Sequence, residues 1–328
     1  MAAIFPVTGS FATTPSYSGE FIPQLWSAKM NAKFYKSTVF GEIANTNWEG
    51  EIKGMGDKVT INNIPTLTIN AYSAGTSLSY EVPTPNTLVM NIDKGFYFAF
   101  QVNDVLAYQS QPNLMELFSN DAAMQMKIKI DSTVLYNTFA SAAAANKGAT
   151  AGALSGAYNL GTDDAPITVT GSNILTLITS LSAVLDEQNV PETERYLILD
   201  PATRQALMSS NLAQAQVTGD AASMLRNGKI GSIDRFTVYV SNNMPRAITG
   251  TNTPYLSGDG SENGVASTGD VKRRIIMAGH KSALSFASQM TKTETVRNPA
   301  DFGDYIRGLN VFGYKVVKPE SLAYAVVA

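Results

Sequence analysis

Polar and apolar side chains alternate along three stretches of the chain, 57–62, 66–70 and 87–92, and the alternation resumes at 96–100. A period of two residues predicts β-strands that each bury one face. Asparagine, glycine and proline residues between the stretches predict turns, so we interpret this segment as a long β-ribbon. A two-stranded ribbon is only marginally stable alone in water. Another domain or another copy of the chain must therefore supply a surface for the ribbon.

A helical period replaces the alternation after the ribbon. Apolar side chains recur at steps of seven and four residues and form one stripe, composed of Leu117, Met124, Ile128, Leu135 and Phe139. Pro112 suits the first position of a helix, and we predict an unbroken helix from Pro112 to Ala145. At 1.5 Å per residue this helix would span about 51 Å and form a spine. Residues 146–165 have no periodicity and predict a loop of small residues.

Helices and strands alternate between residues 166 and 281, which predicts a second unit of α+β type. A helix is predicted behind a Ser172 cap, with an apolar face of Ile174, Leu177, Ile178, Leu181 and Leu185. Asp200 and Pro201 supply the N-cap and first residue of another helix, which ends near Ser209. Strands are predicted at 196–199, 236–240 and 274–277, and again at 283–296, 304–317 and 322–327.

The chain carries few charged residues for its length. Charged side chains make up 16% of its 328 residues, whereas about 25% is usual for a soluble protein. It has no cysteine, which excludes disulfides, thiolate metal sites and cysteine nucleophiles. The net charge of −3 argues against a protein whose affinity depends on neutralising many phosphates. Any contact with nucleic acid is therefore expected to be weak and non-specific.

No catalytic or ligand-binding constellation stands out, and we predict that the chain is not an enzyme and needs neither a cofactor nor a metal. The single histidine, His280, ends an apolar run, and we interpret it as structural. Gly54, Met55 and Gly56 start like a dinucleotide-binding loop, but the third glycine is absent and a strand pattern follows. Residues 257–263 have oxygen-bearing side chains without the spacing of a calcium loop.

The first 19 residues contain no charged side chain. They lack the basic start and the apolar core of a signal peptide. No run of about 18 apolar residues that would cross a membrane occurs in the chain. Two interpretations of the first segment stay open: a disordered tail, and an arm that becomes ordered on a neighbouring subunit.

Two zones of the chain resemble the major capsid proteins of tailed bacteriophages, the family built on the HK97 fold. The first zone contains FIPQLWSAK at 21–29, WEGEIK at 48–53 and GDKVTI at 56–61. The second contains ADFGDYIRG at 300–308 and YKVVKPE at 314–320. The order of arm, ribbon, long helix, inserted unit and returning strands is also similar to that family. The resemblance covers most of the chain after residue 20.

The resemblance implies an α+β fold of the HK97 type. Its parts would be an N-terminal arm (1–45), an extended β-ribbon loop (46–101), a peripheral domain with the spine helix (102–165), an inserted axial domain (166–281) and return strands of the peripheral domain (282–328). Copies would form pentamers and hexamers through their axial domains and enclose double-stranded DNA in an icosahedral capsid. The extended loop would lie on a neighbouring copy. The protein would act in the virion, after assembly in the host cytoplasm.

Partners besides further copies of the chain also follow from the resemblance. Some relatives carry a cleaved scaffolding segment before the first motif. Because that motif begins here near Phe21, we expect no such segment and a separate scaffolding protein instead. A portal protein is a further expected partner, and the resemblance allows for a decoration protein. Packaged DNA would make weak contacts, and no membrane is expected.

Eight residues in or beside the two zones are candidate assembly contacts: Trp26, Trp48, Lys53, Lys58, Arg297, Asp301, Asp304 and Arg307. Some relatives cross-link a loop lysine to an asparagine of a neighbour, but no motif identifies an asparagine partner here. We interpret Lys53 and Lys58 as solvated lysines in intersubunit ion pairs. The charges between 297 and 307 form either a surface network within one subunit or contacts between subunits.

Two other functions stay open at this point. A nanocompartment shell of the encapsulin type has the same fold and encloses an enzyme instead of a genome. A secreted β-rich binding protein would suit the high serine, threonine and asparagine content, although a secretion signal is absent. The contents of purified particles would distinguish the two shells, and particle size would distinguish both from a binding protein.

Overall fold

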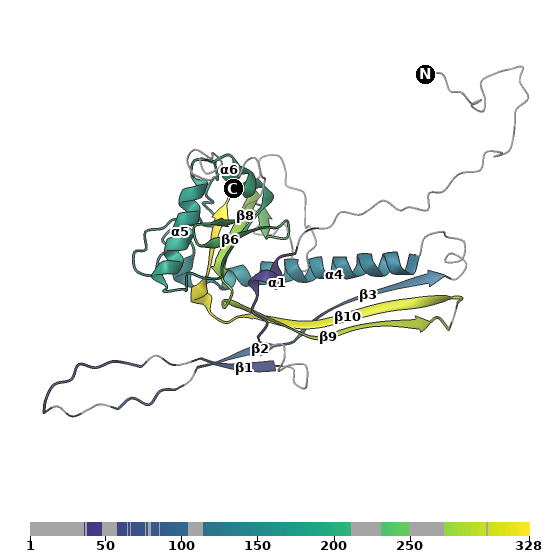
Figure 1. The fold of residues 1–328 in the computed structure, drawn as a ribbon, viewed down its shortest axis with the longest axis horizontal. Coiled ribbons are helices and arrows are strands. Elements are labelled where there is room, and N and C mark those ends of the chain that lie inside the picture. The colour runs from purple at the N-terminus through teal and green to yellow at the C-terminus, as the bar shows by residue number, and fades with distance from the viewer. Residues whose placement is uncertain are drawn as a thin grey trace, which may run out of the picture.

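The structure is a computed structural model of the chain. It describes residues 36, 38–47, 58–63, 65, 67–75, 77, 80–84, 86–103, 114–210, 231–248, 272–299 and 301–328. Figure 1 shows a lobe of mixed helices and strands, and a long helix that runs away from this lobe beside an elongated sheet. A narrow ribbon projects from the other side of that sheet.

The lobe is built on a six-stranded sheet. Its strands are β4 (Arg195–Leu199), β5 (Ser232–Ile233), β6 (Phe236–Val240), β7 (Arg246–Ile248), β8 (Lys272–His280) and β11 (Leu322–Val327). They lie in the order β11-β8-β4-β6-β5, with β7 also paired to β8. β4 and β6 are parallel, and the other pairs of this sheet are antiparallel. The strands predicted at 196–199, 236–240 and 274–277 are confirmed.

The position of β11 corrects the sequence-based expectation. The strand at 322–327 is confirmed, but it does not lie with the return strands of the peripheral domain. A 3₁₀ turn, η4 (Pro319–Ser321), leads into it, and it pairs with β8 from Leu322 opposite Gly279 to Val327 opposite Arg274. All its residues except Tyr324 are buried, which suits a strand covered on both faces. The division into domains stays a prediction.

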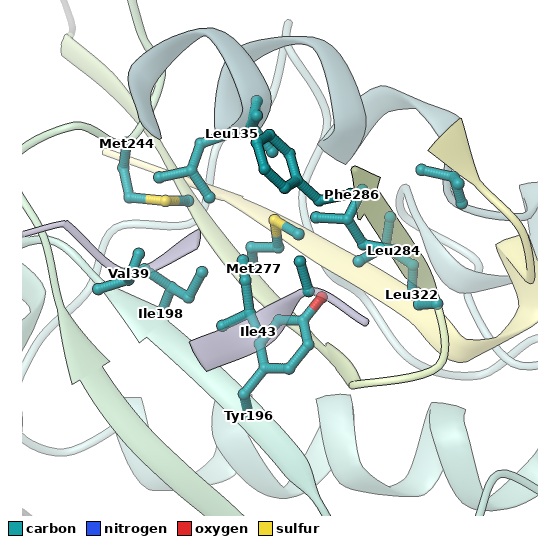
Figure 2. Packing of buried hydrophobic residues seen from close by; sticks show 14 of the residues in the cluster. Val39, Ile43, Leu135, Tyr196, Ile198, Met244, Met277, Leu284, Phe286 and Leu322 are labelled. Atoms are coloured by element: carbon teal, nitrogen blue, oxygen red, sulfur yellow. The ribbon is translucent and has the colours of Figure 1, made fainter. Parts of the chain in front are cut away.

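Both faces of the six-stranded sheet are covered by apolar cores. In β4, Tyr196 and Ile198 face one core, and Leu197 and Leu199 face the other. Figure 2 shows the first core, in which side chains of the sheet such as Met277 meet others from distant segments, among them Val39, Ile43, Leu135 and Phe286. Alternate residues of β4 are therefore buried on opposite sides of the sheet.

Two helices, α5 (Ile174–Glu187) and α6 (Pro201–Met208), cover the second core. The predicted apolar face of α5 is confirmed, since its five residues are buried. Its cap differs from the prediction, because Asn173 and not Ser172 directly precedes the helix. The Asn173 side chain bonds backbone groups before the helix and so shapes the incoming turn. Asp200 caps α6 as predicted, and its carboxylate accepts hydrogen bonds from two backbone N–H groups.

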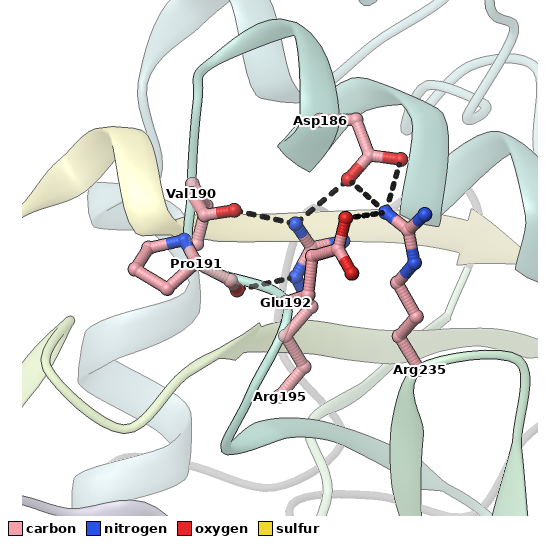
Figure 3. A network of polar contacts seen from close by, with 6 residues as sticks. All are labelled: Asp186, Val190, Pro191, Glu192, Arg195 and Arg235. Atoms are coloured by element: carbon pink, nitrogen blue, oxygen red, sulfur yellow. Dashed lines mark hydrogen bonds and ion pairs between the residues drawn. The ribbon is translucent and has the colours of Figure 1, made fainter.

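A buried arginine joins the end of α5 to the start of β4 (Figure 3). Arg195 is almost completely buried, and its Nη2 lies 2.7 Å from Asp186 Oδ1. Nη2 also donates to Val190 O (2.6 Å), and Nε donates to Pro191 O (2.8 Å). The exposed Arg235 shares Asp186 at 3.0 Å. Charge-assisted hydrogen bonds to two carbonyl groups and a carboxylate hold the turn between helix and strand.

The long helix, α4 (Leu114–Thr138), is the predicted spine, but it is shorter than predicted. It has 25 residues, and Pro112 lies outside the described residues. The chain continues as two 3₁₀ turns, η1 (Phe139–Ser141) and η2 (Ala144–Asn146), instead of running on as α-helix to Ala145. Serine, threonine and asparagine side chains in its last turns donate to carbonyl groups one turn back. Such bonds compete with the helix and help to explain its early end.

A buried carboxylate connects this spine helix to the start of the described chain. Asp131 Oδ1 accepts hydrogen bonds from the backbone N–H groups of Val39 (3.0 Å) and Phe40 (2.8 Å), at the start of α1 (Phe40–Ile43). Its Oδ2 accepts a hydrogen bond from Asn243 Nδ2 (2.6 Å). Burial raises the pKa of the Asp131 carboxyl. Asp131 therefore holds together three segments that are far apart in the sequence.

A three-stranded antiparallel sheet lies beside α4. Its order is β3-β10-β9, with β3 (Lys94–Asn103), β10 (Gly303–Val316) and β9 (Leu284–Arg297). The strands predicted at 283–296 and 304–317 are confirmed. The strand predicted at 96–100 is also confirmed, but it pairs in this sheet and not in the ribbon. The reason is packing against α4, where the rings of Phe100 and Phe118 meet edge to face with centres 6.0 Å apart.

The ribbon is a two-stranded antiparallel ladder of β1 (Lys58–Asn63) and β2 (Asn86–Asn91). These strands confirm the predictions at 57–62 and 87–92. The described residues 67–70, predicted as a strand, form none. In the register of β1 and β2, Asn63 lies opposite Asn86. Continuing this register would place Pro83 opposite Thr66 and Pro85 opposite Ile64. Proline has no backbone N–H to donate, so the ladder ends there.

Candidate assembly surfaces

Buried polar groups such as Asp131 and Arg195 connect segments of the fold. No cluster of three or more histidine, cysteine, aspartate or glutamate side chains suited to a metal ion occurs among the described residues. No helix in the described part of the chain is long and apolar enough to cross a membrane. His280 ends β8, where its Nδ1 accepts a hydrogen bond from Ser282 N (3.1 Å), and burial lowers its pKa. The candidate functional features are exposed surfaces instead.

The loop between β1 and β2, residues 64–85, is here called the ribbon loop. Five large apolar side chains among its described residues are between 55% and 92% exposed, and these are Leu67, Ile69, Tyr72, Tyr80 and Val82. One hydrogen bond across the loop joins Thr68 N to Glu81 Oε2 (3.0 Å). A folded protein rarely leaves so many large apolar side chains together in water unless a partner covers them.

The face of the three-stranded sheet that points away from α4 is here called the open face. The strand registers place three rows of residues side by side on it. The rows are Gln101, Tyr305 and Val296; Ala99, Arg307 and Glu294; and Tyr97, Leu309 and Lys292. Tyr97 is 78% exposed, and the apolar side chains of Val296, Tyr305 and Leu309 are also exposed. The open face is therefore an apolar surface crossed by one charged row.

Ion pairs occupy the middle of the open face. Glu294 Oε2 accepts hydrogen bonds from Arg307 Nε (2.9 Å) and Nη2 (2.6 Å), and Lys292 pairs with the same carboxylate. Hydrogen bonds from Lys292 and then from Arg307 lower the pKa of the Glu294 carboxyl. Opposite charges in directly paired strand positions support the register. Exposed pairs of this kind contribute little to stability and more to the choice of partner.

Among the described residues that were predicted as sites, the structure pairs two with each other. Arg297 Nη1 lies 3.3 Å from Asp304 Oδ1 where β9 passes into β10. Asp301 accepts a hydrogen bond from Phe302 N (2.7 Å) in the connecting turn. Arg307 pairs with Glu294, as described above, and Lys58 is exposed at the start of β1. Trp26, Trp48 and Lys53 lie outside the described residues.

Sequence reasoning missed Glu294 in the charged row and Lys292 in the row beside it. The missing signal was the register of the hairpin. Once Arg297 is placed opposite Asp304, an antiparallel ladder also places Glu294 opposite Arg307. The sequence prediction named charges by their closeness along the chain, whereas partners in a hairpin are related by the position of its turn.

The N-terminal half of α4 is a third exposed surface. Leu117 and Met124 of the predicted stripe are 40% and 44% exposed, while Leu135 near the other end is completely buried. Met115 and Phe118 are exposed beside them. The stripe therefore belongs to the core of one subunit only in the last turns of the helix, which pack against the six-stranded sheet.

Comparison with known protein families gives a match over most of the chain. The profile of the phage capsid protein family matches residues 83–325 of this chain. The match begins in the ribbon loop and ends within β11, so it includes every element of both large sheets. No curated protein matches the sequence.

Solved structures share the fold over almost the whole chain. A chain of Mycobacterium phage Che8 is 25% identical, with a TM-score of 0.71 over 93% of this chain and 96% of that one. A chain from the capsid of the cyanophage P-SCSP1u is 17% identical, with a TM-score of 0.70 over 99% of both chains. One from the capsid of a native GTA particle is 12% identical, with a TM-score of 0.63 over 95% of this chain and 97% of that one.

Proposed function

This chain belongs to the phage capsid protein family, and we propose that its copies form the pentamers and hexamers of an icosahedral shell around double-stranded DNA. It is a structural subunit of a virion capsid and has the predicted α+β fold of the HK97 type. The family match favours this function over an encapsulin-type nanocompartment or a secreted binding protein. The capsomer arrangement, assembly in the host cytoplasm and the lack of enzymatic activity belong to the proposal.

The observation that carries the proposal is the exposed ribbon loop. Moving one large apolar side chain from water into an interface contributes about 1.5–3 kcal/mol. The five exposed side chains of the loop therefore represent a large unused binding energy in the isolated subunit. A neighbouring copy that covers them would recover this energy at every repeat of the shell.

The open face is the acceptor that we assign to the ribbon loop of a neighbour. It offers apolar side chains such as Tyr97 and Leu309 to match those of the loop. Its charged row, with Arg307 and Glu294 at the centre, would fix the orientation of the contact. Each copy would then give one ribbon loop and receive another, a head-to-tail contact that can close into a ring.

Other partners belong to the same proposal. A scaffolding protein would guide assembly, a portal protein would occupy one vertex, and a decoration protein would bind the finished shell. With a net charge of −3, the subunit would contact packaged DNA weakly and without sequence preference. Lys53 and Lys58 are proposed to form ion pairs between subunits.

The test is to express the chain and examine the particles by negative-stain electron microscopy. We expect closed shells from the wild type, and soluble subunits without closed shells when residues 63–86 are deleted. Ile69→Asp places a charge at the most exposed of the described apolar positions of the ribbon loop and should also prevent closure, while Ile69→Leu is the matched control and should assemble. Normal shells from the deletion variant or from Ile69→Asp would refute the role of the loop.

The contents of the particles test the second half of the proposal. Particles purified from infected cells should contain DNA that is protected from nuclease. A protein cargo in place of DNA would support the nanocompartment instead, and a wild-type chain that stays monomeric would refute both shells.

A further inference from the structure

A glycine lies where the ribbon crosses the three-stranded sheet. A Cβ atom added to Gly313 of β10 would lie 2.3 Å from Asn91 O, 3.0 Å from Asn91 C and 3.0 Å from Ile92 Cα. All three are backbone atoms of the last residue of β2 and the residue that follows it, so rotation of a side chain cannot relieve the clash. Any larger residue at 313 must push the ribbon away from the sheet.

A small apolar core holds the ribbon in this position. Val59, Ile61, Met90 and Ile92 pack against Ala287 of β9, with Met90 and Ala287 completely buried. This core is separate from the two cores of the six-stranded sheet. The ribbon is thus fixed where it meets the sheet, whereas the ribbon loop beyond it is exposed.

The sheet is bent at the same place. The register of β9 and β10 shifts between Val311, which faces Met290, and Phe312, which faces Ser288. The extra residue of β9 forms a β-bulge, and bulges bend a strand and increase its twist. The bulge therefore lies within two residues of Gly313 and within two residues of Ala287. The bulge, Gly313 and the small core around Met90 and Ala287 are together called the seat of the ribbon.

We propose that Gly313 is a positioning residue that sets the direction in which the ribbon leaves the subunit. On the proposed function, on which this inference rests, that direction decides where the ribbon loop reaches a neighbour and hence the size of the shell. The six-pair ladder is about 20 Å long, and a fully extended chain from Asn91 to Gly75 would span about 50 Å. A shift of about 1 Å at one end of the ladder would then move the tip of the loop by about 2–3 Å.

The experiment compares Gly313→Ala with Gly95→Ala. Gly95 lies on the neighbouring strand β3, and a Cβ there would meet Asn310 O at 3.6 Å and Val311 Cγ2 at 3.8 Å, which are ordinary contacts. Both substitutions remove the same chain flexibility from the same sheet. We expect Gly95→Ala to form shells of wild-type diameter, and Gly313→Ala to form shells of altered or mixed diameter, or folded subunits that do not close.

Met90→Ala keeps the test decisive if Gly313→Ala does not fold, as judged by circular dichroism. It loosens the seat without a clash, and we expect it to broaden the distribution of diameters. Shells of a single wild-type diameter from a folded Gly313→Ala, or from Met90→Ala where Gly313→Ala does not fold, would overturn the inference. If deletion of residues 63–86 still blocks closure in that case, the proposed function stands and this inference alone fails.

Discussion

The two large sheets of this protein differ in how much of their surface is covered by the same chain. The six-stranded sheet has an apolar core on each face and is complete within one subunit. The three-stranded sheet is covered by α4 on one face, whereas the ribbon covers only one end of its open face and leaves Tyr97, Tyr305 and Leu309 exposed. The six-stranded sheet needs only its own chain, whereas the three-stranded sheet and the ribbon present surfaces that further copies would cover.

This difference separates stability from assembly. A change in the six-stranded sheet should lower the free energy of unfolding of each subunit. A change on the open face should leave the subunit stable and alter its assembly. Substitutions of the same residue type in the two sheets test this distinction most directly.

The largest effect is expected for Arg195→Ala beneath α5. The change leaves the carbonyl groups of Val190 and Pro191 without their buried donor, which should cost about 2–6 kcal/mol of unfolding free energy at about 1–3 kcal/mol for each group. Urea unfolding of unassembled subunits measures the loss. Arg235→Ala is the control, because this exposed arginine shares Asp186 without being buried. Equal effects of the two substitutions would contradict the role given to Arg195.

A leucine in each sheet gives the next comparison. Leu197 of β4 is completely buried and Leu309 of β10 is 38% exposed. Leu197→Ala should lower the free energy of unfolding by about 2–5 kcal/mol through lost burial and a cavity. Leu309→Ala should change it by at most about 0.5 kcal/mol and instead reduce the yield of closed shells. Similar losses of stability in both variants would show that the open face is part of the subunit core.

A smaller effect is expected from the single histidine. Burial holds the pKa of His280 below 6.5, and this outweighs the opposing influence of Glu194, while Lys318 and Arg195 act in the same direction as burial. The unfolded chain therefore takes up the proton first. The stabilisation from neutral His280 is present above pH 6.5 and is lost as the pH falls through the lower pKa of the folded state. Melting temperatures between pH 7.5 and 5 should fall less for His280→Gln than for the wild type.

The smallest effect on stability is expected for Arg307→Ala. Its partner Glu294 is on the open face, where solvent screens the pair, so the melting temperature of the subunit should not change. Assembly should become slower and less sensitive to salt, since one charge of the proposed contact is gone. Light scattering at low and high ionic strength measures both. A clear drop in melting temperature would mean that the charged row stabilises the sheet itself.

Periodicity in the sequence predicted most of the elements. The alternation at 57–62 and the helical face of α5 both identified segments whose own residues decide their structure. The predictions were wrong for segments whose structure depends on contacts with distant parts of the chain. The stretch 66–70 alternates like a strand, but its described residues have no strand opposite them, and α4 ends at Thr138 although its small residues continue the helical pattern.

The candidate surfaces were predicted in the same uneven way. Arg297 and Asp304 were both named as candidates because their charges lie close together along the chain, and the structure pairs them. Glu294 was not predicted because its partner, Arg307, lies on the next strand. Gly313 was not predicted because it contacts Asn91, which is far away in the sequence. No local pattern reports which backbone will cross a glycine.

The amino-acid pattern alone was enough to indicate the order of ribbon, long helix and mixed unit, the low charge, and the lack of a catalytic constellation. The order of the elements and the low charge follow from side-chain periods and composition, which act between near neighbours in the chain, whereas the lack of a catalytic constellation stays a prediction. The structure was needed to place β11 beside β8, to move β3 out of the ribbon and to leave one face of the β3-β10-β9 sheet open. Those outcomes depend on competition among distant segments for the same buried surface, because a strand shows which face it buries but not against what.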